Sequence, residues 1–351
     1  MDLGPLLEAL YGRRVEHCVE SVGSTIGRGR GDASSRSYAR VRIRDAGVAP
    51  QTSVVMQLPN DPLRSDEGGG RERTRELAFV NVQRCMKARG VPVPDVLLDA
   101  SRSHGKVLLQ DLGDTTLEKR LGSIPAGGWA PEYDAAVDLL AELHDRMAQP
   151  DPACVAYGRH FDRALLRWEL DHYREWGLEA RLGITLASEL RTRLDGAFDR
   201  LVDRLASLPM GFVHRDYQSR NLMIHDGALW VIDFQDALMG PRIYDLVALL
   251  CDSYVDVAPA LREREIERYA ARRGLERGAV AAELHLVALH RKLKDSGRFV
   301  FIDRVKKNPD FLPHVPQSLE YVRRALRLAT DVGDLREALA EAAPGDFGSV
   351  V

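Results

Sequence analysis

The chain has 351 residues, of which 45% are hydrophobic, and its formal net charge is −3 at pH 7. This length suits two domains or one bilobal unit, and the lack of a basic excess argues against a general nucleic-acid-binding protein. No apolar run reaches the length of about 18 residues typical of a membrane span, and the N-terminus lacks the pattern of a signal peptide. The cysteines lie far apart and predict free thiols. We therefore expect a cytoplasmic protein with a sizeable core and no membrane or nucleic-acid partner.

The first part of the chain predicts a small β-rich lobe. A short amphipathic helix is expected over residues 1–20, followed by a loop rich in Gly and Ser over residues 23–37. Strands are predicted at 38–43 and 53–58, where the pattern of apolar residues is typical of strands. Residues 63–74 are charged and glycine-containing, and they predict a mobile surface loop without chemistry.

A helix and a hairpin complete this lobe. The apolar spacing over residues 77–89 predicts a helix that ends at Gly90, because the prolines that follow cannot continue it. Segments 96–98 and 106–112 predict a hairpin that leads into Gly113 and forms the hinge between two lobes.

The remainder of the chain has mainly helical patterns, so the expected fold class is α+β. We divide the chain into an N-lobe of residues 1–112 and a C-lobe of residues 113–351. Amphipathic or apolar spacing in the C-lobe predicts helices at 132–147, 161–176, 187–205, 244–254, 259–273, 278–295 and 316–330. The final stretch from Gly333 is rich in Ala and Glu and is expected to fray.

An acid, an amide and a second acid occur close together within residues 211–237. Asp216 lies five residues before Asn221 in a polar loop, and Asp233 ends a short apolar strand after a turn at residues 226–227. A hairpin here would bring Asn221 near Asp233, and amide and carboxylate oxygens are suitable ligands for Mg²⁺. A separate carboxylate can orient and deprotonate an attacking hydroxyl. The pattern therefore predicts phosphoryl transfer, with Asp216 as the catalytic base and Asn221 and Asp233 as metal ligands.

Other polar residues of this region have structural interpretations. His214 is expected to pack beneath the loop and to form a hydrogen bond with its backbone. Asp236 is either a third acid near the metal or a helix cap. Asp245, in the first turn of the next helix, is expected to be a cap or a partner of Arg215.

The loop over residues 31–36 can present backbone N–H groups to phosphates. Its candidate residues for nucleotide binding are Ser34, Ser35 and Arg36.

One group expected of protein kinases is missing. Those enzymes carry a Lys on the third strand that pairs with the nucleotide phosphates and a helix Glu, whereas this strand offers Met56 and Gln57. Glu76 would then be solvated for lack of a partner. The charge would have to come from an arginine, for which the candidates are Arg36, Arg40 and Arg42. The absence argues against a protein kinase and leaves open a weakened or inactive enzyme.

The catalytic segment resembles the signature of the aminoglycoside phosphotransferase/choline kinase superfamily. The resemblance rests on His214-x-Asp216-x4-Asn221 and on the apolar strand that ends in Asp233. Further blocks are more similar to the anomeric N-acetylmuramate/N-acetylglucosamine kinases of bacterial cell-wall recycling. These blocks lie at residues 31–41, 110–117, 161–170, 214–223, 232–237, 240–250 and 290–294. The chain departs from that family at residues 63–75 and 295–298, where the second segment replaces a usually apolar turn.

The resemblance implies a bilobal protein-kinase-like fold that uses ATP and Mg²⁺. It places the adenine against the backbone of Gln110, Asp111 and Leu112, and it implies phosphorylation of the anomeric hydroxyl of an amino sugar to a sugar 1-phosphate. The family commonly lacks the third-strand Lys.

The acceptor is less defined than the reaction. Polar residues on helices expected near the acceptor are candidates for binding it: Glu169, Asp171, His172, Arg291 and Lys294. The alternatives are an aminoglycoside kinase, which would need an acidic site, and an amino-alcohol (choline-type) kinase, which would need an aromatic cage. The tryptophans are dispersed along the chain and do not predict a cage. A nucleotide-binding pseudokinase scaffold is a further alternative, and the sequence leaves the oligomeric state open.

Overall fold

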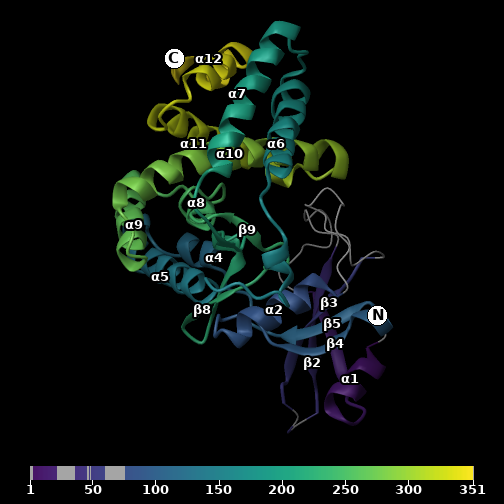
Figure 1. Ribbon diagram of the computed structural model, residues 1–351. Helices are drawn as coiled ribbons and strands as arrows, with labels where there is room; N and C mark the ends of the chain where they lie inside the picture. The colour runs from purple at the N-terminus through teal and green to yellow at the C-terminus, as the bar shows by residue number, and fades with distance from the viewer. Residues whose placement is uncertain (1–2, 22–35, 46, 48, 60–75, 351) are drawn as a thin grey trace. The chain divides into compact units, whose positions relative to one another are not determined.

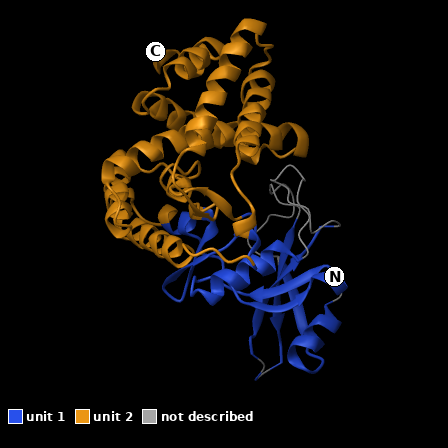
Figure 2. Ribbon diagram, in the orientation of Figure 1, with its two compact units in different colours: residues 1–120, 153–155, 220–236 blue, residues 121–152, 156–219, 237–351 orange. Residues whose placement is uncertain are grey.

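The computed structural model describes residues 3–21, 36–45, 47, 49–59 and 76–350 (Figure 1). The chain divides into two compact units (Figure 2). Unit 1 comprises Met1–Arg120, Ala153–Val155 and Arg220–Asp236, and unit 2 comprises Leu121–Pro152, Ala156–Ser219 and Ala237–Val351. The mixed composition, a sheet in the first part and helices in most of the rest, confirms the predicted α+β class.

Unit 1 is built on an antiparallel sheet with the strand order β1-β2-β3-β5-β4. The strands are β1 (His17–Ser21), β2 (Ser37–Ile43), β3 (Thr52–Gln57), β4 (Val96–Ala100) and β5 (Lys106–Gln110). The helix α1 (Gly4–Tyr11) covers part of the sheet, because Leu6 and Leu7 pack in one buried cluster with Val41, Val55 and Leu108. The predicted strands of this region are confirmed.

The predicted first helix is too long. It ends at Tyr11 because Gly12 follows with φ +69°, a left-handed conformation that ends a helix at little steric cost. The chain then forms β1, which pairs with β2. The predicted loop over 63–74 lies outside the described residues.

The helix α2 (Ala78–Ala88) agrees with its prediction and buries one face, including Phe79, Val82 and Met86. Short helices follow at α3 (Ser101–His104) and α4 (Leu117–Gly122).

A later hairpin also belongs to unit 1. Its strands β7 (Leu222–His225) and β8 (Ala228–Val231) pair around Asp226 and Gly227. Both turn residues have positive φ, which is typical of the two-residue turns that match the twist of a hairpin. The hairpin joins unit 1 because Ile224 donates a backbone hydrogen bond to Thr115 and Val231 donates one to Pro92, both at 2.8 Å. The division of the chain into lobes at residue 112 stays a prediction, and unit 1 extends beyond it by this hairpin and by residues 113–120.

Unit 2 is mainly helical and contains the short pair β6 (Met210–Val213) and β9 (Leu238–Pro241). Its longer helices are α5 (Ala130–Arg146), α6 (Arg163–His172), α7 (Ser188–Ala206), α8 (Tyr244–Leu250), α9 (Pro259–Arg272), α10 (Arg277–Lys306), α11 (Val315–Leu328) and α12 (Gly333–Ala342). The short elements are η1 (Ala126–Gly128), η5 (Pro309–His314), α13 (Pro344–Phe347) and η6 (Gly348–Val350), with η2 (Val155–Gly158) and η4 (Ser219–Asn221) at unit borders. The segment η3 (Tyr173–Ala180) continues α6 as a π-helix.

The helix α10 is the centre of unit 2, since it contacts α6, η3, α8, α9 and α11. Gly297 lets it approach η3 closely, because a Cβ at this position would lie 2.8 Å from the Cα of Tyr173. The helix predicted at 278–295 is therefore too short, because α10 continues through residues 295–298 to Lys306. None of the helices in the described ranges combines the length and the apolar character that crossing a bilayer requires.

The expectation that the chain frays from Gly333 is wrong. Residues from Gly333 form α12, which contacts α7. Leu335, Leu339 and Phe347 are buried, so this end of the chain contributes to the core of unit 2.

Candidate active site

The predicted catalytic loop follows β6 in unit 2. The buried carboxylate of Asp245, in the first turn of α8, accepts hydrogen bonds from the backbone N–H groups of His214 (2.7 Å) and Arg215 (2.9 Å). Arg215 has φ +82°, a left-handed conformation that residues other than glycine rarely adopt. The two bonds to Asp245 support this conformation. Asp245 is thus a partner of Arg215, one of the two roles that the sequence suggested, and the contact is made through the backbone of the loop.

Two histidines extend this support. The ring Nδ1 of His214 accepts a hydrogen bond from the backbone N–H of Asp216 at 3.2 Å, as expected for a histidine beneath the loop. The ring of His144 lies between Asp245 and the hydroxyl of Tyr269, at 3.3 Å and 2.7 Å. These side chains are buried, so the loop rests on a polar network that water does not reach.

The guanidinium of Arg215 has a partner other than Asp245, which binds only the backbone of this residue. Its Nη2 donates to Oε1 of Glu169, on α6, at 2.9 Å, and both side chains are buried. Burial would raise the pKa of Glu169, but Lys294, Arg215 and His290 outweigh it and lower that pKa. Glu169 is therefore an ionised, buried counter-ion of the catalytic loop.

Asp216 is held by an arginine from α10. Arg291 is fully buried; its Nη1 donates to the carbonyl of Arg215 at 2.6 Å, and its Nη2 donates to Oδ1 of Asp216 at 3.1 Å. Burial opposes ionisation of Asp216, but Arg291, Lys294 and Arg215 lower its pKa to about 2. The side chain of Asp216 is 21% exposed. It is thus an oriented carboxylate that stays ionised at neutral pH.

Asp295 balances the cations of this helix. Its carboxylate lies 2.7 Å from Nζ of Lys292, 3.2 Å from Nζ of Lys294 and 3.8 Å from Nε of Arg291. Burial would raise the pKa of Asp295, but the three cations hold it well below its usual range. Asp295 therefore anchors the cations that surround Asp216.

The residues predicted to bind the acceptor lie in different environments. Glu169 and Arg291 are buried against the catalytic loop, which favours a supporting role. Asp171 forms an ion pair with Arg167 at 2.9 Å. His172 is 9% exposed, and the side chain of Lys294 is 13% exposed. Direct contact with an acceptor stays a prediction for all of them.

The predicted metal ligands belong to unit 1. The carbonyl of Asn221 accepts a hydrogen bond from the backbone N–H of Ile232 at 3.0 Å, which continues the β7–β8 ladder. Asp233 follows directly with φ +66°, a left-handed conformation that ends the strand. The hairpin register therefore places Asn221 beside Ile232, the residue that precedes Asp233, and the role of Asn221 and Asp233 as metal ligands stays a prediction.

A neighbouring amide connects two acids. The Nε2 of Gln235 donates to Asp233 at 2.9 Å and to Asp236 at 3.0 Å. Asp236 lies in a turn, and the next helix begins only at Tyr244, so the helix-cap interpretation of Asp236 is wrong. Within the described ranges, no group of three or more His, Cys, Asp and Glu side chains could hold a metal. Asn221 and Asp233 suit a hard cation that takes its remaining ligands from phosphate and water oxygens.

The residues predicted near the nucleotide also lie in unit 1. Gln110 ends β5, and its Oε1 accepts a hydrogen bond from the backbone N–H of Asp95 at 3.2 Å. Leu112 is buried, and Arg36 lies just before β2. Ser34 and Ser35 lie outside the described residues.

Asp111 is the partner of a strand arginine. Arg40, on β2, forms two hydrogen bonds with Asp111, at 2.7 Å and 2.9 Å, and two with Asp114, at 2.8 Å and 3.2 Å. Arg40 and Asp111 are both nearly buried, whereas Asp114 is 46% exposed. Arg40 therefore ties β2 to the segment after β5, and its charge is neutralised there.

In the absence of a third-strand Lys, the nearby polar side chains form other contacts than the sequence suggested. Gln57 donates to the carbonyl of Gly105 at 3.0 Å. Glu76 is not simply solvated: it forms an ion pair with Arg84 at 2.7 Å and accepts a hydrogen bond from Asn81 at 2.9 Å. Arg42 is exposed and pairs with Glu20 at 3.2 Å.

Two of the tryptophans are not dispersed. Trp168 and Trp176 both lie beside His172, with ring centroids 5.5 Å and 6.3 Å from it. The sequence interpretation missed this cluster, although the spacing of 168, 172 and 176 places the three residues on one face of a helix.

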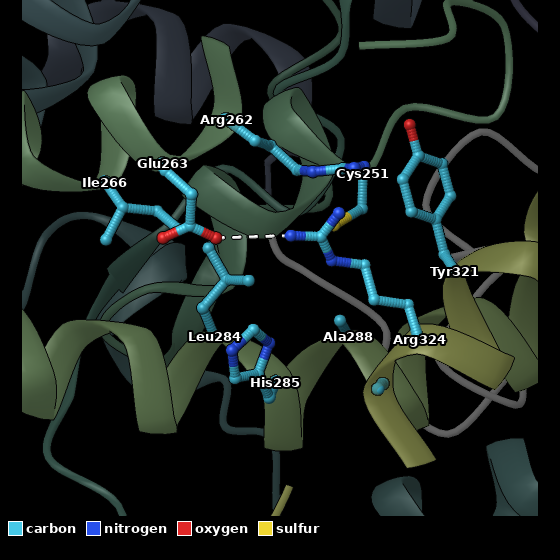
Figure 3. A pocket seen from close by; sticks show the side chains of 10 residues that line it. Cys251, Arg262, Glu263, Ile266, Leu284, His285, Ala288, Tyr321 and Arg324 are labelled. Carbon is cyan, nitrogen blue, oxygen red and sulfur yellow. Dashed lines mark hydrogen bonds and ion pairs between the residues drawn. The ribbon is translucent and has the colours of Figure 1, made fainter. Parts of the chain in front are cut away.

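A pocket is present elsewhere in unit 2 (Figure 3). Its lining comes from α9, α10, α11 and the residue after α8, and it includes Cys251, Arg262, His285 and Tyr321. It contains none of the predicted site residues and therefore does not locate the acceptor.

Comparisons with known proteins place the chain among kinases. The sequence model of the phosphotransferase enzyme family matches residues 30–282. An N-acetylmuramate/N-acetylglucosamine kinase from Pseudomonas aeruginosa is 31% identical over 90% of this chain and 87% of its own length.

Solved structures agree on the fold. A choline kinase from Streptococcus pneumoniae superimposes with a TM-score of 0.60 over 92% of this chain and 98% of that one, at 13% identity. An amicoumacin kinase in complex with AMP-PNP and Ca²⁺ superimposes with a TM-score of 0.55 at 14% identity, covering 91% and 92% of the two chains. The chain, an enzyme that phosphorylates its substrate on a protein-kinase-like fold, belongs to the phosphotransferase enzyme family.

Proposed function

We propose that this protein transfers the γ-phosphoryl group of ATP to the anomeric hydroxyl of an N-acetylated amino sugar, N-acetylmuramate or N-acetylglucosamine. The observation that carries the proposal is the 31% identity to a kinase of that name over 90% of the chain. We also propose that the protein works in the cytoplasm, where ATP is available.

Asp216 performs the central step. Its ionised carboxylate accepts the hydrogen bond of the anomeric hydroxyl and aligns the oxygen with the phosphorus. Because the pKa of Asp216 is only about 2, the carboxylate is a weak base in the ground state. It takes the proton as the hydroxyl becomes acidic, while the new O–P bond forms, the bond from the γ-phosphorus to the β,γ-bridging oxygen breaks, and ADP leaves.

Asn221 and Asp233 offer an amide and a carboxylate oxygen to Mg²⁺, which neutralises phosphate charge when bound. The backbone of Gln110, Asp111 and Leu112 would receive the adenine, and Ser34, Ser35 and Arg36 are the residues proposed to bind the phosphates. With the proposed boundary at residue 112, the N-lobe would cover the nucleotide, and the C-lobe would hold the catalytic loop, the metal and the acceptor.

An acceptor panel tests this function. The protein is incubated with ATP and Mg²⁺ and, separately, with N-acetylmuramate, N-acetylglucosamine, kanamycin and choline, and the products are identified by ³¹P NMR. We expect an anomeric sugar phosphate from at least one amino sugar. A phosphorylated aminoglycoside or choline as the sole product would overturn the assignment, and ATP binding without turnover on any acceptor would favour the pseudokinase alternative.

A further inference from the structure

A strip of aromatic and cationic side chains lies on α6, η3 and α10 of unit 2. It consists of Trp168, His172, Trp176, Arg298 and Phe301, and we call it the aromatic strip. The ring of His172 stacks on Trp168 at 5.5 Å and meets the edge of Phe301 at 5.1 Å, while Trp176 lies 5.2 Å from Phe301. Trp168 is 41% exposed, which is unusual for so large an apolar side chain.

Arg298 gives the strip a positive charge. Its guanidinium lies 5.2 Å over the ring of Phe301, and no carboxylate in the described part of the chain forms an ion pair with it. By contrast, Arg304, farther along α10, pairs with Asp303 at 3.5 Å. Lys294 lies one helical turn before Arg298 and thus on the same face of α10. Because Lys294 is paired with Asp295 at 3.2 Å, the charge that this face offers to an anion comes mainly from Arg298.

One ring nitrogen of His172, within the aromatic strip, has an unsatisfied hydrogen-bonding capacity. Its Nε2 is buried, and no hydrogen-bond partner for that atom exists within the described residues. Burial and the nearby Arg298 lower the pKa of His172 to about 4, so the ring is neutral at pH 7. A neutral ring between tryptophans suits the apolar face of a sugar, and the charge for an anion comes from α10.

The aromatic strip and the arginine that binds the catalytic carboxylate share the helix α10. Arg291 holds Asp216, and Lys294 and Arg298 follow it along the same helix at three and seven residues. Since an α-helix rises 1.5 Å per residue, Arg298 lies about 10 Å farther along the axis than Arg291. An acceptor whose reacting hydroxyl is at Asp216 can reach Arg298 with a substituent of its ring.

We propose that Arg298, assisted by Lys294, binds the carboxylate of an acidic amino sugar, while Trp168 and Phe301 pack against its apolar parts. The inference rests on the proposed function and refines its substrate class. N-acetylmuramate carries a lactyl carboxylate where N-acetylglucosamine has a hydroxyl, so Arg298 determines preference between the two sugars. A cationic acceptor such as choline or an aminoglycoside is repelled by Arg298 and Lys294.

The test compares both sugars with the same variants. Arg298→Leu is expected to lower kcat/KM for N-acetylmuramate about tenfold more than for N-acetylglucosamine, the loss expected for a charge-assisted contact. Arg298→Lys should recover part of the difference, because it restores the charge. Trp168→Ala should raise KM for both sugars. Arg304→Leu, on the same helix, is the control and should change neither sugar's kinetics.

Calorimetry separates this inference from the proposed reaction. In the presence of AMP-PNP, wild-type protein should bind N-acetylmuramate, and Arg298→Leu should bind it about tenfold more weakly. Equal losses for both sugars, no loss, or no binding of N-acetylmuramate to the wild type would overturn the role of Arg298. Binding that depends on Arg298 but without turnover would overturn the proposed reaction and leave this inference standing.

Discussion

Charged side chains support predicted functional residues in both units, but at different depths. In unit 2 the catalytic loop is held by Glu169, Arg291 and Asp245, whose side chains are all buried. In unit 1 Arg40 holds Asp111 and Asp114, and the second of these is 46% exposed. Water can replace part of a partner at the exposed pair but not in the buried network. Loss of one group should therefore cost more in unit 2 than in unit 1.

The largest effect is expected at the catalytic carboxylate. Asp216→Asn keeps the shape of the side chain but removes the negative charge. The variant can no longer orient the acceptor hydroxyl and accept its proton in the same way, so kcat should fall by about 10²–10⁴-fold. Steady-state kinetics with the accepted sugar measure this, and circular dichroism checks that the fold survives. Near-normal turnover would contradict the role of Asp216. Asp233→Ala should also abolish transfer if Asp233 is the proposed metal ligand, and raised Mg²⁺ concentrations should not restore the activity fully.

The buried counter-ion comes next. Glu169→Gln leaves the guanidinium of Arg215 without its carboxylate, and the free energy of unfolding should fall by about 3–5 kcal/mol, as for other broken buried ion pairs. Urea denaturation measures the change. The control is Glu142→Gln, which breaks the exposed pair with Arg146 and should cost less than about 1 kcal/mol. Similar costs for the two variants would show that burial does not distinguish these pairs.

Arg291 links the buried network to pH dependence. With Arg291 present the pKa of Asp216 is about 2, so the acid is ionised throughout the usual assay range. Arg291→Met removes a positive charge but leaves the burial, and the pKa should rise by about 1–3 units. Activity of the variant should therefore decline between pH 6 and pH 4, where the wild type keeps its ionised carboxylate.

The pH profile of kcat checks this shift, and Arg291→Lys is the matched control because it keeps a charge. The lowered pKa of Asp216 also affects the pH dependence of the free energy of unfolding. A lowered pKa in the folded state stabilises the protein above the pKa of the unfolded chain, and this contribution is lost as pH falls toward 2. Identical acid limbs for Arg291→Met and the wild type would refute control of Asp216 by Arg291.

The smallest effects are expected in the sheet of unit 1. Arg40→Gln removes charge-assisted bonds to Asp111 and Asp114, and it should lower the free energy of unfolding by about 1.5–3 kcal/mol. Arg42→Gln, on the same strand, breaks only the exposed pair with Glu20 and should cost less than about 1 kcal/mol. Thermal and urea denaturation measure both. A cost for Arg40 that exceeds that of Glu169→Gln would reverse the comparison between the units.

Local patterns predicted much of the fold. The amphipathic spacing predicted most of the longer helices of unit 2, and the turn at Asp226 and Gly227 predicted the hairpin that ends at Asp233. Predictions were wrong where packing outweighed the local pattern. Residues from Gly333 form α12 because their leucines pack into the core. The helix predicted at 278–295 continues to Lys306, and Gly297 within this extension allows it to pack closely against Tyr173.

The sequence by itself determined the class of reaction, a phosphoryl transfer, which the family match confirms. The roles of Asp216, Asn221 and Asp233 in that reaction stay predictions from their spacing. Only the tertiary structure decided what supports them. Glu169 lies 46 residues from Arg215, and Arg291 lies 75 residues from Asp216. Partners so far apart leave no periodic signal in the sequence. Their contact depends on how α6 and α10 pack around the catalytic loop, and that packing also brings Trp168 and Arg298 into one strip.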